Sequence, residues 1–397
     1  ASPRASAGLE SKAQLHADWA FAAHHLFNPP LSWRSRHMKA AVLREYNAPL
    51  EIEEIQIDKP GPYEVLTRTA ASGICHSDLH VIEGGIPMPT PCVLGHEPAG
   101  IVEAVGSEVT DFKPGDHVIG CLNAWCGKCN YCLTGRPHLC MPPEMLARLD
   151  GSSRLTKDGG PIMQFALSSF AEQMLTHERS LVKIRDDMPL DRASLIGCGV
   201  TTGIGAALRT AKVEPGAVCA VIGCGGVGLS TLQGCRIAGA SRIIAVDTMD
   251  WKLELARELG ATDVINASNG DPVAQIQELT GGGVDYAFEC IGLKPTIQQA
   301  VGMAAKGGAA VLVGVLAVTE TVEFSAADIT LQEKRILGSF MGSNAFRRDM
   351  PQYVDYYLDG RLRLDEMISK RIPLEEINPA FDAMKAGEVA RSVIVFD

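Results

Sequence analysis

The chain lacks an excess of positive charge and any long hydrophobic run. Its 36 lysines and arginines are outnumbered by 47 aspartates and glutamates, which gives a net charge of −11. Such a charge argues against nucleic acid or an anionic membrane surface as a partner. No apolar stretch approaches the length of about 20 residues that a membrane-spanning helix needs, and no segment has the pattern of a secretory signal peptide. We therefore expect a cytoplasmic protein that binds neither nucleic acid nor membranes.

With 397 residues, the chain has room for two domains that each bury a core. It contains 12 cysteines, and without an export signal their clustered spacing indicates metal ligation rather than disulfides. Residues 1–37 differ in composition from the rest of the chain, and Met38 begins a stretch typical of a strand. We expect residues 1–37 to be an extension outside the fold. An organelle presequence is the alternative, because basic residues outnumber acidic ones there.

A glycine-rich turn follows an apolar run in the middle of the chain. The run Val218–Ile222 leads into Gly223, Gly225 and Gly228, which have the spacing G-x-G-x-x-G. This pattern predicts a strand, a tight turn and a helix whose free N–H groups bind a pyrophosphate. Asp247 ends the next apolar run, at about the distance where a carboxylate binds ribose hydroxyls. Because this carboxylate would repel a 2′-phosphate, NAD is favoured over NADP. Later apolar runs alternate with helical segments, which predicts a doubly wound parallel sheet.

A region of short strands precedes this part of the chain. From Met38 to about residue 120, strand patterns alternate with glycine and proline turns, which indicates a partly closed β domain. Cys75 and His96 lie in this region, each with a carboxylate close by in the sequence. A thiolate and an imidazole with supporting carboxylates suit a zinc site. Taken singly, however, each residue is more often an ordinary buried side chain.

Four cysteines follow within a short segment. Cys126, Cys129, Cys132 and Cys140 have the spacing C-x₂-C-x₂-C-x₇-C. Four thiolates can enclose one tetrahedral zinc ion with no open position, as a structural site requires. An iron–sulfur cluster is the alternative. The long interval before the fourth cysteine, and the lack of a second cluster motif, disfavour it.

Together these motifs carry a resemblance to a known family. They occur in this order: Cys75–His80, Gly95–Glu97, the four cysteines, Gly197–Gly203 and the glycine turn. This set resembles that of the zinc-dependent medium-chain alcohol dehydrogenases, from about Met38 to Phe396. The resemblance implies a zinc-binding catalytic domain with a partly closed, GroES-like β barrel, formed by residues 38–200 and 341–397. It also implies a Rossmann domain that binds NAD, formed by residues 201–340, with the active site in the cleft between the two domains.

The resemblance further implies two zinc ions per chain. The catalytic ion would be held by Cys75, His96 and Cys198, since two cysteines and one histidine are the known ligands in alcohol dehydrogenases. The four-cysteine segment would hold the structural ion.

The groups around the catalytic zinc are implied in the same way. Ser77 would accept the alcohol proton and His80 would pass it towards solvent. Asp78 would orient the histidine ligand, and Glu97 would lie behind the zinc.

The resemblance also implies a set of residues for NAD(H). These are His76, Thr202, Gly223, Gly225, Gly226, Val227, Gly228, Asp247, Lys252, Val313 and Arg391. Several relatives have arginine where this chain has His76. A neutral imidazole holds a phosphate less firmly, so we expect looser NADH binding here.

By the same resemblance, an apolar pocket for the substrate would be lined by Leu122, Phe165, Ala166, Val315 and Phe340. We expect an enzyme that interconverts primary or secondary alcohols and aldehydes or ketones, by hydride transfer from a zinc-bound alkoxide to NAD. One alternative is a dehydrogenase of S-(hydroxymethyl)glutathione or another thiol adduct of formaldehyde. The loop from Glu83 to Thr90 lacks the arginine and most of the acidic residues usual there. The other alternative, a non-catalytic dinucleotide-binding relative, is disfavoured by the complete ligand set. The long segment from Pro142 to Phe170 resembles an insertion of dimeric members, so we expect a homodimer.

Overall fold

The structure is a computed structural model that describes residues 36–142, 147–317 and 319–397. Nearly all of the expected N-terminal extension therefore lies outside the described residues. The first described strand begins at Arg36, two residues before the start that Met38 suggested.

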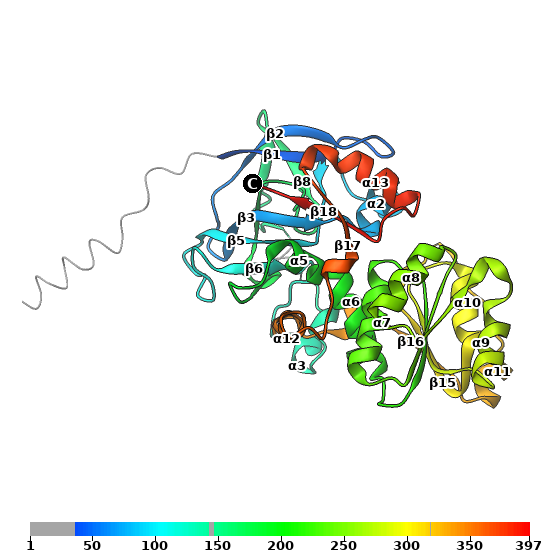
Figure 1. Ribbon diagram of the computed structural model, residues 1–397. Helices are drawn as coiled ribbons and strands as arrows, with labels where there is room; N and C mark the ends of the chain where they lie inside the picture. Colours follow the sequence, from blue (N-terminus) through cyan, green and yellow to red (C-terminus); the bar gives the residue numbers. More distant parts are fainter. Residues whose placement is uncertain (1–35, 143–146, 318) are drawn as a thin grey trace, which may run out of the picture. The chain divides into compact units, whose positions relative to one another are not determined.

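The first part of the fold is a β domain with two sheets (Figure 1). One closes into a barrel, in the order β1 (Arg36–Leu43), β2 (Glu51–Ile57), β7 (Leu155–Lys157), β8 (Gly160–Gln164) and β4 (Cys92–Val93). The other has the order β10 (Leu181–Lys183), β6 (His117–Gly120), β5 (Pro98–Val105), β3 (Glu64–Gly73), β18 (Arg391–Val395) and β17 (Ile368–Ile372), with β9 (Gln173–His177) also paired to β3. The expected barrel-like β domain is thus confirmed. The pairing of β18 with β3 brings the end of the chain back to this domain.

The second part is a parallel sheet with helices on both faces. Its strands follow the order β13 (Asp263–Asn266), β12 (Arg242–Asp247), β11 (Val218–Ile222), β14 (Val284–Glu289), β15 (Ala304–Leu312) and β16 (Arg335–Gly338). All neighbouring pairs are parallel. This is the strand order of a Rossmann fold, so the expectation of a doubly wound sheet is confirmed.

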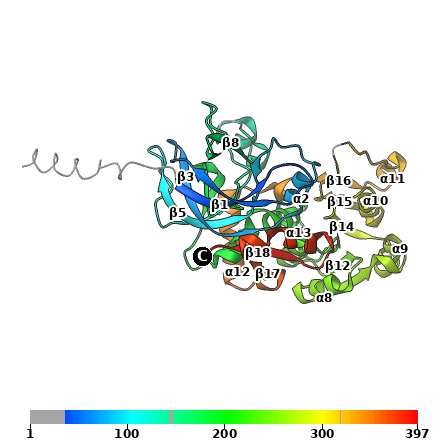
Figure 2. The same cartoon turned by 90° about the horizontal axis from the view of Figure 1, so that it is seen from above.

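Side-chain alternation along β11 explains the two helical layers. Cys219 and Val221 face a core shared with α7 (Gly226–Ala238) and α8 (Asp250–Leu259). Ala220 and Ile222 face a core shared with α9 (Pro272–Thr280) and α10 (Lys294–Met303). A strand that is buried on both faces needs apolar residues at every position, which is why β11 reads as an unbroken apolar run. Figure 2 shows α8 and α9 to α11 (Ala326–Leu331) grouped around this sheet, apart from β1, β3 and β5.

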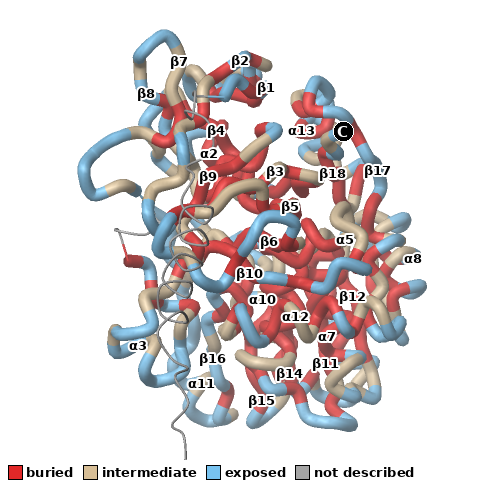
Figure 3. The backbone as a smooth tube through the Cα atoms, turned by 90° about the vertical axis from the view of Figure 1, so that its left-hand side faces the viewer, coloured by how far each residue is buried: buried red, intermediate tan, exposed pale blue. Residues whose placement is uncertain are grey.

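A continuous helical stretch connects the two parts. It comprises α5 (Leu190–Leu195), the π-helical η3 (Ile196–Val200), α6 (Thr201–Gly205) and the π-helical η4 (Ala206–Ala211). The expected domain boundary between residues 200 and 201 falls inside this stretch. One large core cluster contains residues of both parts, such as Ile119 of β6 and Leu229 of α7, and buried backbone runs through both parts in Figure 3.

The remaining helices are shorter or lie near the C-terminus. They are α2 (His76–Ile82), α3 (Asn130–Leu133), α12 (Phe346–Leu358) and α13 (Ile377–Lys385), with 3₁₀ turns η1 (Pro137–Leu139), η2 (Glu178–Ser180), η5 (Ala267–Asn269), η6 (Met341–Ser343), η7 (Asp365–Met367) and η8 (Leu374–Glu376). Among the described residues, no helix combines the length and the apolar character needed to cross a membrane.

Candidate active site and metal centres

Three segments far apart in the sequence meet in a buried cluster of metal-binding groups. Cys75 precedes the first turn of α2, His96 lies between β4 and β5, and Cys198 lies in η3. Together with Glu97, their possible ligand atoms lie within 4.8 Å of one another, and all of these residues are buried. The fold therefore brings the three predicted ligands of the catalytic zinc together.

The hydrogen bonds of His96 prepare this cluster for a cation. Its Nδ1 lies 3.0 Å from Oδ1 of the fully buried Asp78, which also accepts the Gly95 N–H at 3.0 Å. A ring that donates from Nδ1 presents the lone pair of Nε2. Nε2 is buried and has no hydrogen-bond partner within the described ranges. Because a buried polar atom without a partner is costly, the donor set fits a zinc ion.

The charge state of Cys75 fits the same conclusion. A hydrogen bond with Cys198 lowers the pKa of the Cys75 thiol well below its usual value. Burial raises this pKa, but the nearby His96 lowers it further, so that the lowering prevails. The pKa of Cys198 is raised in turn. A thiolate beside an imidazole is a strong ligand pair for Zn²⁺.

Glu97 and Arg391 link this cluster to the glycine turn. Glu97 accepts the Gly199 N–H at 3.2 Å with one oxygen, and its other oxygen forms a buried ion pair with Arg391. Arg391 also lies over the glycine turn, since a Cβ atom on Gly226 would be 2.5 Å from Cδ of the arginine. Glu97, predicted behind the zinc, and Arg391, predicted to bind NAD(H), are thus direct neighbours.

The two predicted proton-transfer groups share one short helix. The half-buried Ser77 lies in the first turn of α2, with its Oγ 3.8 Å from Sγ of Cys75. His80 lies one turn further on and is exposed. Residues three apart on a helix lie on the same face, so the order from ligand to hydroxyl to imidazole leads from the metal cluster to solvent.

The glycine turn has the geometry of a phosphate-binding loop. Gly223 has a φ of 92°, which favours glycine. Gly226, Val227 and Gly228 form the first turn of α7, and Gly228 lies directly against the Gly223 carbonyl, where a side chain has no room.

Asp247 braces this turn from the end of β12. Its Oδ2 accepts the N–H of Cys224 at 2.7 Å, and its Oδ1 accepts those of Thr248 and Met249 at 2.8 and 3.0 Å. The Lys252 ammonium, also predicted to bind the cofactor, lies 5.5 Å from the centre of the Trp251 ring.

The other predicted cofactor residues lie on different elements. His76 begins α2 and is exposed. Thr202 is buried in α6, and its hydroxyl contacts Sδ of Met341 at 3.7 Å. Val313 directly follows β15, and its N–H donates to the carbonyl of Glu289 at 2.9 Å.

The predicted pocket residues differ in their surroundings. The Phe165 ring meets the His96 ring edge-on, with centroids 5.9 Å apart, and Leu122 packs on the core cluster that contains Cys75 and Cys198. Ala166, at a φ of 54°, packs on a different cluster in the β domain. Val315 and Phe340 are exposed, at 72% and 45%.

The four-cysteine segment folds around its own sulfur atoms. The Sγ atoms of Cys126, Cys129, Cys132 and Cys140 lie within 4.8 Å of one another. Sγ of Cys126 accepts the N–H groups of Cys129 and Lys128 at 3.2 and 3.4 Å. These backbone bonds, that of Lys128 foremost, lower the pKa of the Cys126 thiol to about 6. Four sulfur donors, one of them set up as a thiolate, fit a tetrahedral zinc ion.

Comparison with known proteins identifies the family. The model of the alcohol dehydrogenase GroES-like domain matches residues 61–186, and that of the zinc-binding dehydrogenase matches residues 226–358. The chain is 42% identical over 368 residues to an alcohol dehydrogenase class-3 from Myxine glutinosa, covering 90% of this chain and 97% of the relative. The chain belongs to the zinc-dependent medium-chain alcohol dehydrogenases. The members of this family are oxidoreductases that act on small molecules. The two matched domains imply zinc and a nicotinamide nucleotide as cofactors.

Solved structures of alcohol dehydrogenases are also similar. Benzyl alcohol dehydrogenase from Acinetobacter calcoaceticus superposes with a TM-score of 0.86 at 36% identity, covering 91% of this chain and all of the other. An alcohol dehydrogenase zinc-binding domain protein from Burkholderia ambifaria has a TM-score of 0.88 at 38% identity, covering 92% of this chain and all of the other.

One residue beside the predicted dehydrogenase site was not expected from the sequence. Glu289 ends β14 and is fully buried. Its Oε1 accepts the N–H groups of Ile291 and Gly292 at 2.9 and 2.8 Å and the Thr296 hydroxyl at 2.8 Å. Glu289 thereby fixes the turn that lies next to Val313. A glutamate that closes an apolar strand three residues before a glycine is the sequence signal that could have revealed it.

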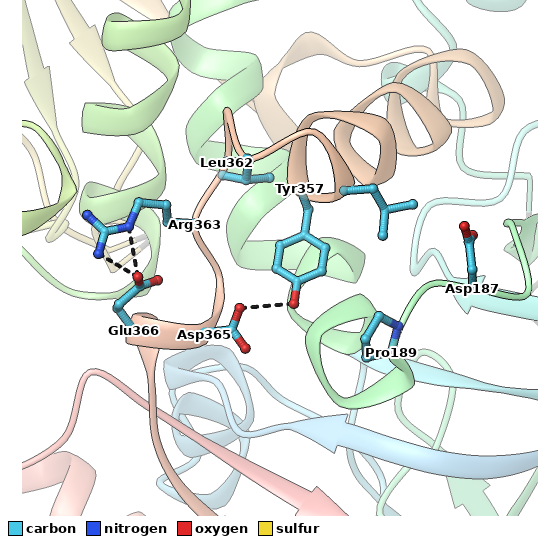
Figure 4. A pocket seen from close by; sticks show the side chains of 9 residues that line it. Asp187, Pro189, Tyr357, Leu362, Arg363, Asp365 and Glu366 are labelled. Carbon is cyan, nitrogen blue, oxygen red and sulfur yellow. Dashed lines mark hydrogen bonds and ion pairs between the residues drawn. The ribbon is translucent and has the colours of Figure 1, made fainter.

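A surface pocket of about 370 Å³ lies elsewhere, beside the end of α12 and η7 (Figure 4). Its lining comprises Asp187, Pro189, Tyr357, Leu358, Gly360, Leu362, Arg363, Asp365 and Glu366. None of these residues was predicted to bind metal, cofactor or substrate. Several of its polar groups pair with one another, such as the Tyr357 hydroxyl with Asp365 at 2.9 Å.

Proposed function

We propose that the protein oxidises hydrophobic primary or secondary alcohols with NAD and catalyses the reverse reduction. The observation that carries this proposal is the buried set of Cys75, His96 and Cys198, of which Cys75 directly precedes α2, the helix that holds Ser77 and His80. A zinc ion bound there would supply a Lewis acid that makes an alcohol more acidic.

The chain itself would handle the proton and the orientation of the ligands. Ser77 accepts the alcohol proton, and His80 hands it to solvent from the exposed end of α2. A bound nicotinamide would take up the hydride from the carbon that bears the hydroxyl group, so that one alcohol and one NAD⁺ would give one carbonyl compound, one NADH and one proton. Asp78 holds the His96 ring through the 3.0 Å contact to its Nδ1, and Glu97 holds Arg391 at the glycine turn.

The cofactor proposal rests on the charges around the turn. Arg391 covers Gly226, and Asp247 lies at the end of β12. Arg391 favours a pyrophosphate, whereas Asp247 would repel a 2′-phosphate, so NAD is preferred to NADP. We assign cofactor binding to residues 201–340, and catalysis to residues 38–200 and 341–397.

The preference for a hydrophobic alcohol is supported by the apolar surroundings of the metal cluster. Phe165 contacts His96, and Leu122 packs near Cys75 and Cys198. A similar solved structure is a benzyl alcohol dehydrogenase. The second candidate is oxidation of a thiol adduct of formaldehyde, favoured by the 42% identity to a class-3 alcohol dehydrogenase.

The initial rate of NADH formation separates the two candidates. Zinc-loaded protein is assayed with benzyl alcohol and with S-(hydroxymethyl)glutathione, and Ser77→Ala serves as a variant that lacks the proposed proton acceptor. A rate with benzyl alcohol that Ser77→Ala abolishes supports the first candidate. A strong preference for the glutathione adduct establishes the second, and no rate with either substrate rejects both.

We also propose that the protein is a homodimer. Strand β16 lies at the edge of the parallel sheet, and its residue Ile336 is 38% exposed. Exposed edge strands with apolar residues favour pairing with another chain. Sedimentation equilibrium of the whole protein should give twice the chain mass of 42.4 kDa, and Ile336→Lys should shift it towards one chain mass. A monomer in the unaltered protein would reject this proposal.

A further inference from the structure

Tyr46 fastens the loop that follows α2. Its hydroxyl donates a hydrogen bond to the Met88 carbonyl at 2.6 Å and accepts one from the Met88 N–H at 2.7 Å. Its ring packs over Gly84, where a Cβ atom would lie 3.6 Å from Cγ of the tyrosine. The next residue, Asn47, donates its N–H to the carbonyl of Ile82, at the end of α2, at 2.7 Å. The turn between β1 and β2 therefore holds both ends of the segment Gly84–Met88.

This loop lies against the proposed proton-transfer group. The Ile86 N–H donates to the His80 carbonyl at 3.1 Å. Gly85 sits beside the His80 side chain, since a Cβ atom there would be 3.9 Å from Cβ and 4.0 Å from Nδ1 of the histidine. A shift of the loop would therefore change the packing around His80.

The same loop reaches the apolar surroundings of the metal cluster. Ile86 and Met88 pack on the hydrophobic cluster on which Phe165 also packs. The Phe165 ring contacts His96. The loop thus connects His80 with the apolar cluster that borders a proposed zinc ligand.

We propose that Tyr46 is a positioning residue of the alcohol site. By fixing Met88, its hydroxyl keeps the loop Gly84–Met88 against His80 and keeps Ile86 and Met88 in place as an apolar edge for large hydrophobic alcohols. This inference rests on the proposed function, and it assigns Tyr46 a role in substrate preference rather than in the chemical step.

Tyr46→Phe tests the role, because it removes the hydroxyl and keeps the ring over Gly84. Tyr63→Phe is the matched control, since Tyr63 is similarly exposed, at 51% against 40% for Tyr46. The first measurement is hydrogen–deuterium exchange of the peptide Glu83–Thr90. Pro87 and Pro89 carry no amide hydrogen, so the Met88 amide contributes strongly to the signal. We expect faster exchange in Tyr46→Phe and no change in Tyr63→Phe.

The second measurement compares KM and kcat for benzyl alcohol, ethanol and NAD. The net contribution of one typical hydrogen bond corresponds to about a fivefold change in an equilibrium constant. We expect the KM for benzyl alcohol to rise by about that factor in Tyr46→Phe, with little change for ethanol or NAD and an unaltered melting temperature.

Two results would overturn the proposal: equal exchange in the two variants, or faster exchange without any change in the preference between the alcohols. If the unaltered protein oxidises neither alcohol, the proposed function fails and the role in substrate preference fails with it. The exchange comparison would still decide whether the hydroxyl holds the loop.

Discussion

At the scale of single residues, His76 shows how one side chain can set cofactor affinity. It begins α2 next to Cys75. Desolvation by the surrounding protein lowers its pKa, and although the Cys75 thiol opposes this, the charges of Arg391 and Lys252 lower it further. The lowered pKa favours the neutral imidazole, which adds less positive charge to the proposed phosphate site than an arginine would.

His76→Arg should consequently tighten NADH binding. A guanidinium adds a permanent charge and a hydrogen-bond donor pair for phosphate, and for an exposed group we expect the Kd to fall by about fivefold. Fluorescence titration with NADH at pH 7.5 measures this change. His37→Arg, in β1, adds the same charge elsewhere and should leave the Kd unaltered. Equal affinities of His76→Arg and the unaltered protein would contradict the prediction.

Asp78→Asn tests the support of the proposed zinc ligand. The asparagine keeps the size of the side chain but loses the negative charge that the His96 ring and the Gly95 N–H now face. Loss of such a supporting carboxylate lowers metal affinity by about 10- to 100-fold. With increasing chelator, the variant should therefore release one zinc ion earlier than the unaltered protein does. The four-cysteine site serves as the internal control, and simultaneous release of all metal from both sites would speak against this role of Asp78.

At the scale of elements, the patterns that could be predicted from the sequence are local ones. The bounds of β11 and the turn after it follow from an apolar run and three glycines that are adjacent in the chain. The cysteines of the four-cysteine segment are also close in the sequence, so their spacing alone brings them together.

Contacts between distant elements could not be predicted in this way. The ion pair of Glu97 with Arg391 depends on the pairing of β18 with β3, which no local pattern specifies. Ala166 has a left-handed backbone and packs, half-buried, against a core cluster of the β domain, and residue type gives no sign of that.

A salt-bridge network ties the segment before β7 to the start of β3. The buried Glu64 contacts Arg148 at 2.6 Å and Arg154 at 2.6 Å. Burial alone would raise the pKa of Glu64, but the hydrogen bonds and charges of the two arginines outweigh it and lower the pKa to about 2. A carboxyl group whose pKa is lower in the folded than in the unfolded state stabilises the fold at a pH above its unfolded-state pKa. This contribution is lost as the pH falls towards its folded-state pKa.

Glu64→Gln should therefore destabilise the protein in a pH-dependent manner. From the size of the shift we expect a loss of about 3 kcal/mol in the free energy of unfolding at pH 7. The difference from the unaltered protein should shrink between about pH 4.5 and pH 2, because Glu64 then becomes protonated in both states. Urea unfolding at several pH values measures it. Glu108→Gln, at an exposed site, should have little effect, and a pH-independent difference for Glu64→Gln would contradict the electrostatic explanation.

At the scale of the whole molecule, the four-cysteine segment is joined to the rest of the fold by a few aromatic and cationic contacts. The Arg347 guanidinium, on α12, lies 5.3 Å from the centre of the Trp125 ring, just before the first cysteine. Arg179 donates to the carbonyl of Trp125 at 3.5 Å. The proposed zinc ion would order the segment locally, and these contacts link the segment to α12 and η2.

Cys132→Ser should separate the two proposed metal sites. A tetrahedral site that loses one of four thiolates binds zinc much more weakly, so elemental analysis should find one zinc ion per chain instead of two. The remaining ion at Cys75, His96 and Cys198 should still support turnover. Because the bound metal stabilises the folded state by mass action, calorimetry should show a lower melting temperature. Lys128→Ser, in the same segment and exposed, should keep both ions and the melting temperature. If Cys132→Ser keeps both ions, the four cysteines do not form a zinc site; if it loses both, the two sites depend on each other across the fold.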